Sequence, residues 1–410
     1  MFAQITATSH KLQAVRALRH RNYRWFWFSA NAVAIARGMQ FLTLGWLVLE
    51  LTDSAAQLGL TVFLYGIPNL TLVLFGGIFA DRIDRRKLLA SSQAMVSIII
   101  FILAVLTMTG LVALWHIYVG TFILGVLQAI NMPSRMAIVA DLVGREDIMN
   151  AVVLNSAVMN YGRILGPAMA GGIIEITGIG PALYVNAGCY LIGTVCLFLI
   201  KGLSQGTVAR KTAILGDLLE GLRYFWSTPV AFAVIGTGFA FGFFGMPYVQ
   251  VMPAFASEVL GVGAGGTGLL ITAAGVGSLI GTLALVSLGN FSHKNWLLIG
   301  SFFIFGVGLF LFAWSPWFWL SWVLLMFVGM GSMVPMGTTV LQLTVPPELQ
   351  GRVLSLWYVS AGLMFIGALP MSLVAEALGW PIALAGGAAL FLLVSLWLGV
   401  WQPALRRLKV

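Results

Sequence analysis

Apolar stretches of about 20 residues alternate with short polar turns along almost the whole chain of 410 residues. A bilayer core of about 30 Å requires roughly 20 apolar residues in helical conformation, so each stretch predicts a membrane-spanning helix. Twelve are predicted, near residues 25–50, 57–80, 88–110, 113–134, 150–173, 181–200, 230–252, 267–288, 296–313, 317–340, 353–375 and 381–401. The expected fold class is therefore an all-α polytopic membrane protein with 12 transmembrane helices.

Composition supports this prediction. Hydrophobic residues make up 60% of the chain and charged residues 9%, against roughly 45–50% and 25% in soluble domains. The net charge is +9, but the bases lie beside apolar stretches rather than among stacking aromatic residues, so we expect no nucleic-acid partner. Cys189 and Cys196 share one apolar stretch and are interpreted as packing residues, with no disulfide, metal or other cofactor expected.

The distribution of Lys and Arg predicts the orientation. The first 24 residues are polar and basic and lack a small-residue cleavage site, so we expect no cleaved signal peptide. Twenty of the 22 bases, Arg135 among them, fall in this segment, in alternate loops and in the C-terminal tail. Because cytoplasmic flanks are enriched in Lys and Arg, both termini are predicted to be cytoplasmic. The other two bases, Arg37 and Arg163, fall inside predicted spans.

One long polar interruption, at residues 201–228, divides the spans into six and six. Its second half, from about Thr212, has apolar residues at helical spacing and is predicted to lie on the membrane surface. Weak similarity between residues 124–142 and 328–346 suggests that the two halves are repeats, as in many transporters. The expected organisation is a basic segment 1–24, a first bundle 25–200, a linker 201–228, a second bundle 229–401 and a tail 402–410.

The stretch GGIFADRIDRRKLL at residues 76–89 holds six charged residues in one short cytoplasmic turn. It resembles the signature loop of the major facilitator superfamily, and Asp84 stands where the commonest form of that signature has Gly. Other segments, including GRILGPAMAGG at residues 162–172, resemble the branch that contains the enterobactin exporter and macrolide-efflux-type proteins. The matched signature positions are Gly77, Ala80, Asp81, Arg82, Arg85 and Arg86.

The resemblance implies two pseudo-symmetric six-helix bundles that transport by alternating access, in a monomer of the bacterial inner membrane, with no enzyme activity. The expected partners are a small-molecule substrate and the lipid bilayer. It also implies a latch between the bundles, for which positive-inside anchoring is the alternative explanation. The expected latch residues are Gly77, Asp81, Arg82, Asp84, Arg85, Arg86, Gly351 and Arg352.

Charged side chains near the bilayer midplane cost at least about 2.5–3.5 kcal/mol and usually have a function. Arg37 and Arg163 lie at that depth, and no acidic residue is placed there to neutralise them. We interpret them as part of a positive central cavity that receives an anionic or oxygen-rich ligand; the alternative is a structural Arg that bonds helix-end carbonyls. The predicted substrate-binding residues are Arg37, Gln40, Asn155, Asn160, Arg163, Phe241, Phe244, Tyr248, Gln250, Met333 and Tyr358.

Gly162 and Gly166 are four residues apart and Pro167 follows, a pattern that predicts close helix packing and a bend. The pattern resembles a signature of exporting antiporters. No G-x-x-x-x-G-K-[ST] motif is present, so an ion gradient is expected to drive transport. Glu50, Asp53 and Glu258 are candidate coupling acids, although solvated carboxylates are the alternative, and proton antiport is an expectation from the family.

These observations favour an exporter of an amphipathic, oxygen-rich or anionic small molecule, such as a siderophore or a drug. A transporter of lysophospholipids or similar lipids is the alternative, because arginines in a cavity suit a phosphate head group equally well. A scaffold without transport activity is disfavoured, since no soluble partner domain is predicted.

Overall fold

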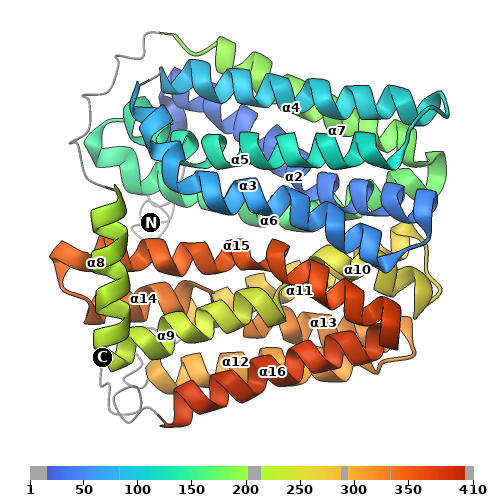
Figure 1. Cartoon of the computed structure of the whole chain (residues 1–410). Helices are drawn as coiled ribbons and strands as arrows, with labels where there is room; N and C mark the ends of the chain where they lie inside the picture. Colours follow the sequence, from blue (N-terminus) through green and yellow to red (C-terminus); the bar gives the residue numbers. More distant parts are fainter. Residues whose placement is uncertain (1–15, 83, 202–213, 288–293, 333, 402–410) are drawn as a thin grey trace, which may run out of the picture. The chain divides into compact units, whose positions relative to one another are not determined.

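The computed structural model describes residues 16–82, 84–201, 214–287, 294–332 and 334–401, and all regular secondary structure among these residues is helical (Figure 1). Helices coincide with all twelve predicted stretches. Among the described residues, nine helices are long and apolar enough to cross a membrane, and the apolar helices at Leu297–Ala313 and Phe318–Gly331 are shorter. The molecule is therefore an all-α membrane protein, whereas the count of twelve crossings stays a prediction.

The elements in the first half of the chain follow one another with short connections. They are η1 (Arg16–Arg19), α2 (Arg21–Thr52), α3 (Ala55–Arg82), α4 (Arg85–Met108), α5 (Leu114–Leu142), η2 (Arg145–Asp147), α6 (Ile148–Thr177) and α7 (Ile179–Phe198). The remaining elements are α8 (Ile214–Ser227), α9 (Pro229–Ala240), the π-helical turn η3 (Phe241–Gly245), α10 (Tyr248–Glu258), α11 (Ala264–Ser287), α12 (Lys294–Ala313), α13 (Phe318–Gly331), α14 (Val334–Thr344), α15 (Pro347–Leu378) and α16 (Trp380–Trp401).

The chain divides into two compact units. Unit 1 comprises residues 1–43 and 71–210, and unit 2 comprises residues 44–70 and 211–410. The turn between α2 and α3, together with the adjoining parts of both helices, therefore packs within unit 2. The predicted domains keep this hairpin with the first bundle, so the observed units differ from the prediction at residues 44–70.

In unit 1, α4 lies against α7 (Figure 1) and also packs on α5. Close approach of α2 and α6 depends on glycine. A Cβ atom at Gly162 would lie 2.6 Å from the Cβ of Ala34, and one at Gly166 would lie 2.6 Å from the Cα of Gly38. Only small residues allow two helix backbones to approach so closely. The predicted packing positions on α6 therefore face α2, and they fix the helix turn that carries Arg37.

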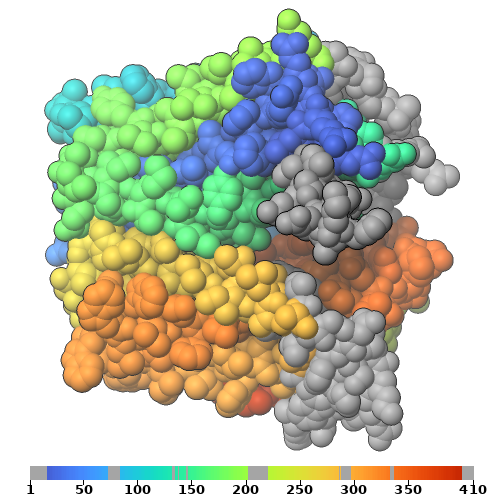
Figure 2. All heavy atoms as spheres, turned by 180° about the vertical axis from the view of Figure 1, so that it is seen from behind, coloured from blue at the N-terminus to red at the C-terminus, as the bar shows by residue number. Residues whose placement is uncertain are grey.

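In unit 2, α11 packs closely against α13, and Figure 2 shows their atoms side by side in yellow and orange. A Cβ atom at Gly281 would lie 2.6 Å from the carbonyl oxygen of Met330. The predicted span 230–252 is interrupted by η3, where the π-helical turn brings Gly242 against the carbonyl of Ser360 on α15. Two of the predicted spans are thus built from more than one helix, because α13 and α14 also divide the stretch 317–340.

The second half of the linker forms α8, as its helical spacing predicted. Glu220 of α8 forms an ion pair with Arg352 of α15, and the ring of Phe225 packs against those of Phe232 and Phe239. Leu222 and Trp226 are exposed, although one edge of the Trp226 ring also lies beside Phe232. An apolar exposed face beside a docked face is typical of a helix at a membrane interface.

Candidate functional site

Arg37 of α2 lies half-buried within unit 1. One Nη of its guanidinium donates a hydrogen bond to Oε1 of Gln128 on α5, at 2.7 Å. One residue earlier in the chain, the carbonyl of Ala36 accepts a bond of 3.1 Å from the amide of Asn186 on α7. Arg37 is therefore held among α2, α5 and α7 by polar side chains, as its position in an apolar span requires.

Arg135 lies where the sequence did not place it. The positive-inside pattern assigned it to a loop after the fourth span, but α5 continues to Leu142 and the residue is only 2% exposed. Its guanidinium carbon lies 5.7 Å from the centre of the Phe26 ring, and one Nη lies 3.4 Å from Oδ1 of Asn155 on α6. The prediction failed because a base near the end of an apolar stretch can belong to a longer helix that continues past it.

Tyr190 of α7 connects the two arginines to the rest of unit 1. Its hydroxyl donates to Oε1 of Gln40 at 2.9 Å, and it interacts electrostatically with both Arg37 and Arg135. The structure thus brings together one set of side chains, which we call the arginine cluster: Arg37, Gln40, Gln128, Arg135, Asn155 and Tyr190. Gln40 and Asn155 were predicted members, whereas nothing in the sequence singled out Gln128 or Tyr190.

The arginine cluster carries two positive charges without a compensating acid. Arg37 and Arg135 are close enough to act electrostatically on each other, and no acidic side chain among the described residues forms an ion pair with either. Moreover, Nε of Arg135 and Oδ1 of Asn131, one helical turn earlier on α5, are buried without a hydrogen-bond partner among the described residues. Buried charges and polar groups without partners are costly. The cluster is therefore suited to an anionic group that accepts hydrogen bonds.

The structure shows no contact with this cluster for the other predicted substrate residues that it describes. Asn160 and Arg163 of α6 and Tyr358 of α15 are exposed. Phe241 packs among Phe302, Phe305 and Phe391 inside unit 2. Elsewhere in unit 2, Tyr248 is buried against Phe305, Gln250 is buried, and Phe244 is half-buried beside Phe243. Met333 lies outside the described residues.

The predicted latch is described in part. Gly77, Asp81 and Arg82 belong to the last turns of α3, which ends at Arg82. The surroundings of their side chains lie outside the described part of the structure. Asp84 caps the N-terminus of α4, where its Oδ1 accepts a bond of 2.9 Å from the amide of Arg86. This role explains a carboxylate at that position.

Two basic side chains of the same loop, those of Arg85 and Arg86, have partners inside their own unit. Arg85 pairs with Asp141 at the end of α5, with 2.9 Å between Nη1 and Oδ2. Arg86 donates to the carbonyl of Ile200 after α7. On α15, Gly351 has open space around it and Arg352 pairs with Glu220, as described above.

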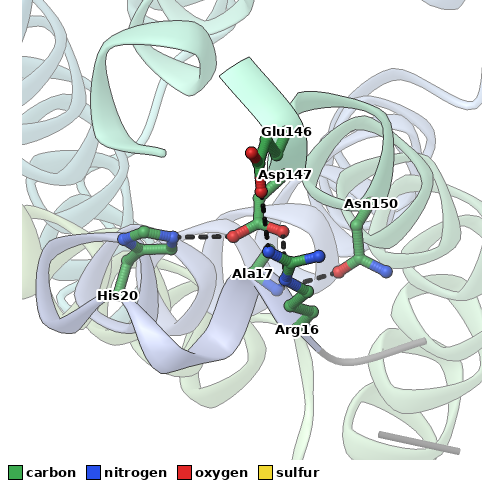
Figure 3. Close-up of polar contacts among 6 residues, drawn as sticks. All are labelled: Arg16, Ala17, His20, Glu146, Asp147 and Asn150. Atoms are coloured by element: carbon green, nitrogen blue, oxygen red, sulfur yellow. Dashed lines mark hydrogen bonds and ion pairs between the residues drawn. The ribbon is translucent and has the colours of Figure 1, made fainter. Parts of the chain in front are cut away.

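A second polar cluster joins the beginning of the chain to the N-terminus of α6 (Figure 3). Asp147 accepts from Nε of Arg16 at 3.0 Å and contacts Nε2 of His20 at 2.9 Å. Glu146 pairs with Arg16 as well, and Oδ1 of Asn150 accepts from the amide of Ala17 at 3.0 Å. These bonds hold η1 against α6 in unit 1.

The candidate coupling acids Glu50, Asp53 and Glu258 are all exposed, and their side chains form no hydrogen bond or ion pair with other described residues. Asp53 adopts the left-handed backbone conformation, with φ of 48°, in the turn between α2 and α3. No group of three or more His, Cys, Asp or Glu suited to a metal occurs in the described part of the chain.

Comparison with known proteins identifies the class. Residues 13–407 match the family described as transmembrane secretion effectors. The chain belongs to this family and is thus a transporter of the major facilitator superfamily, not an enzyme. It is a multi-pass membrane protein, as the apolar helices indicate.

Three similar proteins differ in the substrates that their names state. The multidrug efflux pump Tap of Mycolicibacterium fortuitum is 27% identical, over 89% of this chain and 94% of the pump. The staphyloferrin A transporter of Staphylococcus aureus is 25% identical, over 87% and 90%. The enterobactin exporter EntS of Escherichia coli is 26% identical, over 80% of each chain. Among solved structures, a mutant of the peptide transporter POT aligns with a TM-score of 0.75 at 12% identity and covers 95% of both chains, which shows the shared fold.

Proposed function

We propose that this transporter is a secondary active exporter of an anionic or oxygen-rich small molecule, of the siderophore or drug type. Transport proceeds by alternating access of a site in the membrane, with both termini in the cytoplasm of a bacterial cell. The observation that carries the proposal is the arginine cluster. Two guanidinium groups among neutral polar side chains, without an acidic partner among the described residues, provide a receptor for carboxylate, catecholate or phosphate oxygens.

The names of the relatives support this class of substrate. Staphyloferrin A and enterobactin are siderophores, and both relatives align with most of this chain. The direction of transport is taken from the enterobactin exporter and the efflux pump. The neighbourhood of Arg37 adds a physical reason, because a ligand that is anionic and amphipathic gains both charge neutralisation and burial there.

A ligand screen on the purified protein tests the proposed site. The probes are enterobactin, staphyloferrin A, an uncharged macrolide and a lysophospholipid, and the readout is the shift of the thermal unfolding midpoint with ligand concentration. We expect an anionic siderophore to stabilise the parent protein. Arg37→Ala is expected to weaken the apparent affinity by about 10- to 100-fold, which corresponds to the loss of one or two hydrogen bonds to a charged group.

The matched control is Lys87→Ala, which removes an exposed base from the same unit and is expected to leave the affinity unchanged. Equal stabilisation of the parent and Arg37→Ala by every anionic probe contradicts the proposed site. Stabilisation by the lysophospholipid alone, lost in Arg37→Ala, favours lipid transport instead.

We further propose that a proton gradient drives export. Proteoliposomes with an imposed pH gradient, and the same vesicles with a protonophore, test this step. Substrate movement against its own gradient is expected only while the pH gradient persists. Movement that is unaffected by the protonophore but follows a sodium gradient excludes proton antiport.

A further inference from the structure

Glu376, near the end of α15, contacts the beginning of α3. Its Oε2 accepts a hydrogen bond of 2.8 Å from the hydroxyl of Ser54 and one of 2.6 Å from the backbone amide of Ala56. All of these groups belong to unit 2, because residues 44–70 pack there. The two contacts join residues that lie far apart in the sequence, on opposite sides of the linker.

The carboxylate occupies the place of a helix cap. The first amides of a helix have no acceptor within the helix, and a negative charge near them is also favoured by the helix dipole. Ser54 itself accepts from the amide of Gln57 at 3.3 Å, so its hydroxyl hydrogen is directed to Glu376. The α3 N-terminus is therefore capped jointly by Ser54 and by a side chain from a distant helix.

Below this contact, α3 and α15 pack without space between them. A Cβ atom at Gly59 would lie 2.6 Å from the Cβ of Ser372, one turn before Glu376. Two turns further along α3, a Cβ atom at Gly66 would collide with Phe365. Ser372 is completely buried, and its hydroxyl has no hydrogen-bond partner among the described residues. The glycines of α3 thus form a close contact with α15 that contains few hydrogen bonds.

We infer that Glu376 controls how firmly the hairpin tip, residues 44–70, is held against α15. Glycine faces that pack tightly but form few hydrogen bonds can separate and close again with little rearrangement of side chains. The two hydrogen bonds that the Glu376 carboxylate accepts then determine how often the faces of α3 and α15 separate. The hairpin is continuous with the parts of α2 and α3 that belong to unit 1. Glu376 is a positioning residue in this step, and the inference holds for any substrate.

Cysteine labelling of the buried contact tests the inference. Cys189 and Cys196, the two native cysteines, are replaced by Ser, and Ser372→Cys is introduced as a nearly isosteric reporter beneath the hairpin. Purified protein in detergent is reacted with a maleimide, and the labelling rate is measured. In the background with Glu376→Ala, we expect the rate to rise about five- to tenfold, since one charged acceptor of two hydrogen bonds is lost. Glu376→Gln retains an uncharged acceptor and is expected to give a smaller rise.

Two controls separate release of the hairpin from general loosening. Glu258→Ala removes an exposed carboxylate of unit 2 and is expected to leave the rate at Ser372→Cys unchanged. A reporter at Ser321→Cys, which is equally buried on α13, is expected not to respond to Glu376→Ala. Ser54→Ala combined with Glu376→Ala is expected to label no faster than Glu376→Ala alone, because both act through the same contact.

The inference is overturned if Glu376→Ala leaves the labelling of Ser372→Cys unchanged. It is also overturned if the Ser321→Cys reporter accelerates equally, which would indicate loss of folding rather than release of the hairpin. Neither result bears on the arginine cluster, since no transported ligand is present in the experiment.

Discussion

The close contact between α2 and α6 gives a quantitative prediction for the stability of Gly162→Ala. A methyl group at Gly162 would lie 2.6 Å from the Cβ of Ala34 and 2.7 Å from its carbonyl carbon and oxygen. Non-bonded carbon atoms normally approach to about 3.5–4.0 Å, so the helices must separate by roughly 1 Å. The obstructing atoms belong to the backbone and to a Cβ, which cannot rotate away. Overpacking of this kind costs about 1–3 kcal/mol.

Gly172→Ala on the same helix is the matched control, because a Cβ atom there meets nothing within 4 Å. Both substitutions gain the helix propensity of Ala over Gly, about 1 kcal/mol. That gain cancels in the comparison, and the difference between the two variants reports the overpacking alone. We expect Gly162→Ala to be less stable than Gly172→Ala by about 1–3 kcal/mol.

The assay is reversible unfolding in mixed micelles with an increasing fraction of dodecyl sulfate, followed by tryptophan fluorescence. Gly172→Ala is expected to unfold at or above the parent midpoint, and Gly162→Ala below that of Gly172→Ala. Equal midpoints for the two variants would refute the reasoning, because α2 and α6 would then have room for the added methyl group.

Three further predictions concern ion pairs. Arg85→Ala removes the partly buried ion pair with Asp141. We expect the free energy of unfolding to fall by about 0.5–1 kcal/mol. A double-mutant cycle with Asp141→Ala, in the same unfolding assay, should give a coupling energy of the same size. Asp147→Asn removes the charge that holds η1, so hydrogen exchange at the amide of Ala17 should accelerate, whereas Glu146→Gln, at a position 82% exposed, should change it less. Glu220→Gln removes the charge that pairs α8 with α15, and limited proteolysis of the linker should become faster, with unchanged cleavage arguing against docking of α8.

The helices were predictable because their signal is local. A run of about 20 apolar residues predicts a spanning helix whatever surrounds it, and the ends of α4, α7 and α12 lie close to the predicted boundaries. The π-helical turn at Phe241–Gly245, which places Gly242 against Ser360 of a distant helix, was not predictable. A hydropathy pattern contains no information on such a contact.

The candidate site was predictable only in outline. Arg37 was found because a charge inside an apolar span is unusual. Arg135 was assigned to a loop because it lies near the end of its stretch, and only the continuation of α5 to Leu142 places it beside Asn155. Tyr190 and Glu376 act through partners on distant helices, and neither residue type is exceptional at its position in the sequence.

Directional flux through the arginine cluster tests the central claim most directly. Inside-out membrane vesicles that contain the parent protein, Arg37→Ala, Arg135→Gln or Lys87→Ala are energised, and the uptake of a labelled anionic siderophore is measured at equal protein levels. The account predicts energy-dependent uptake for the parent protein and for Lys87→Ala, and loss of this uptake in both arginine variants. Both arginine variants are expected to elute from size-exclusion chromatography as folded protein, like the parent. Parent-like uptake by Arg37→Ala and Arg135→Gln would contradict it.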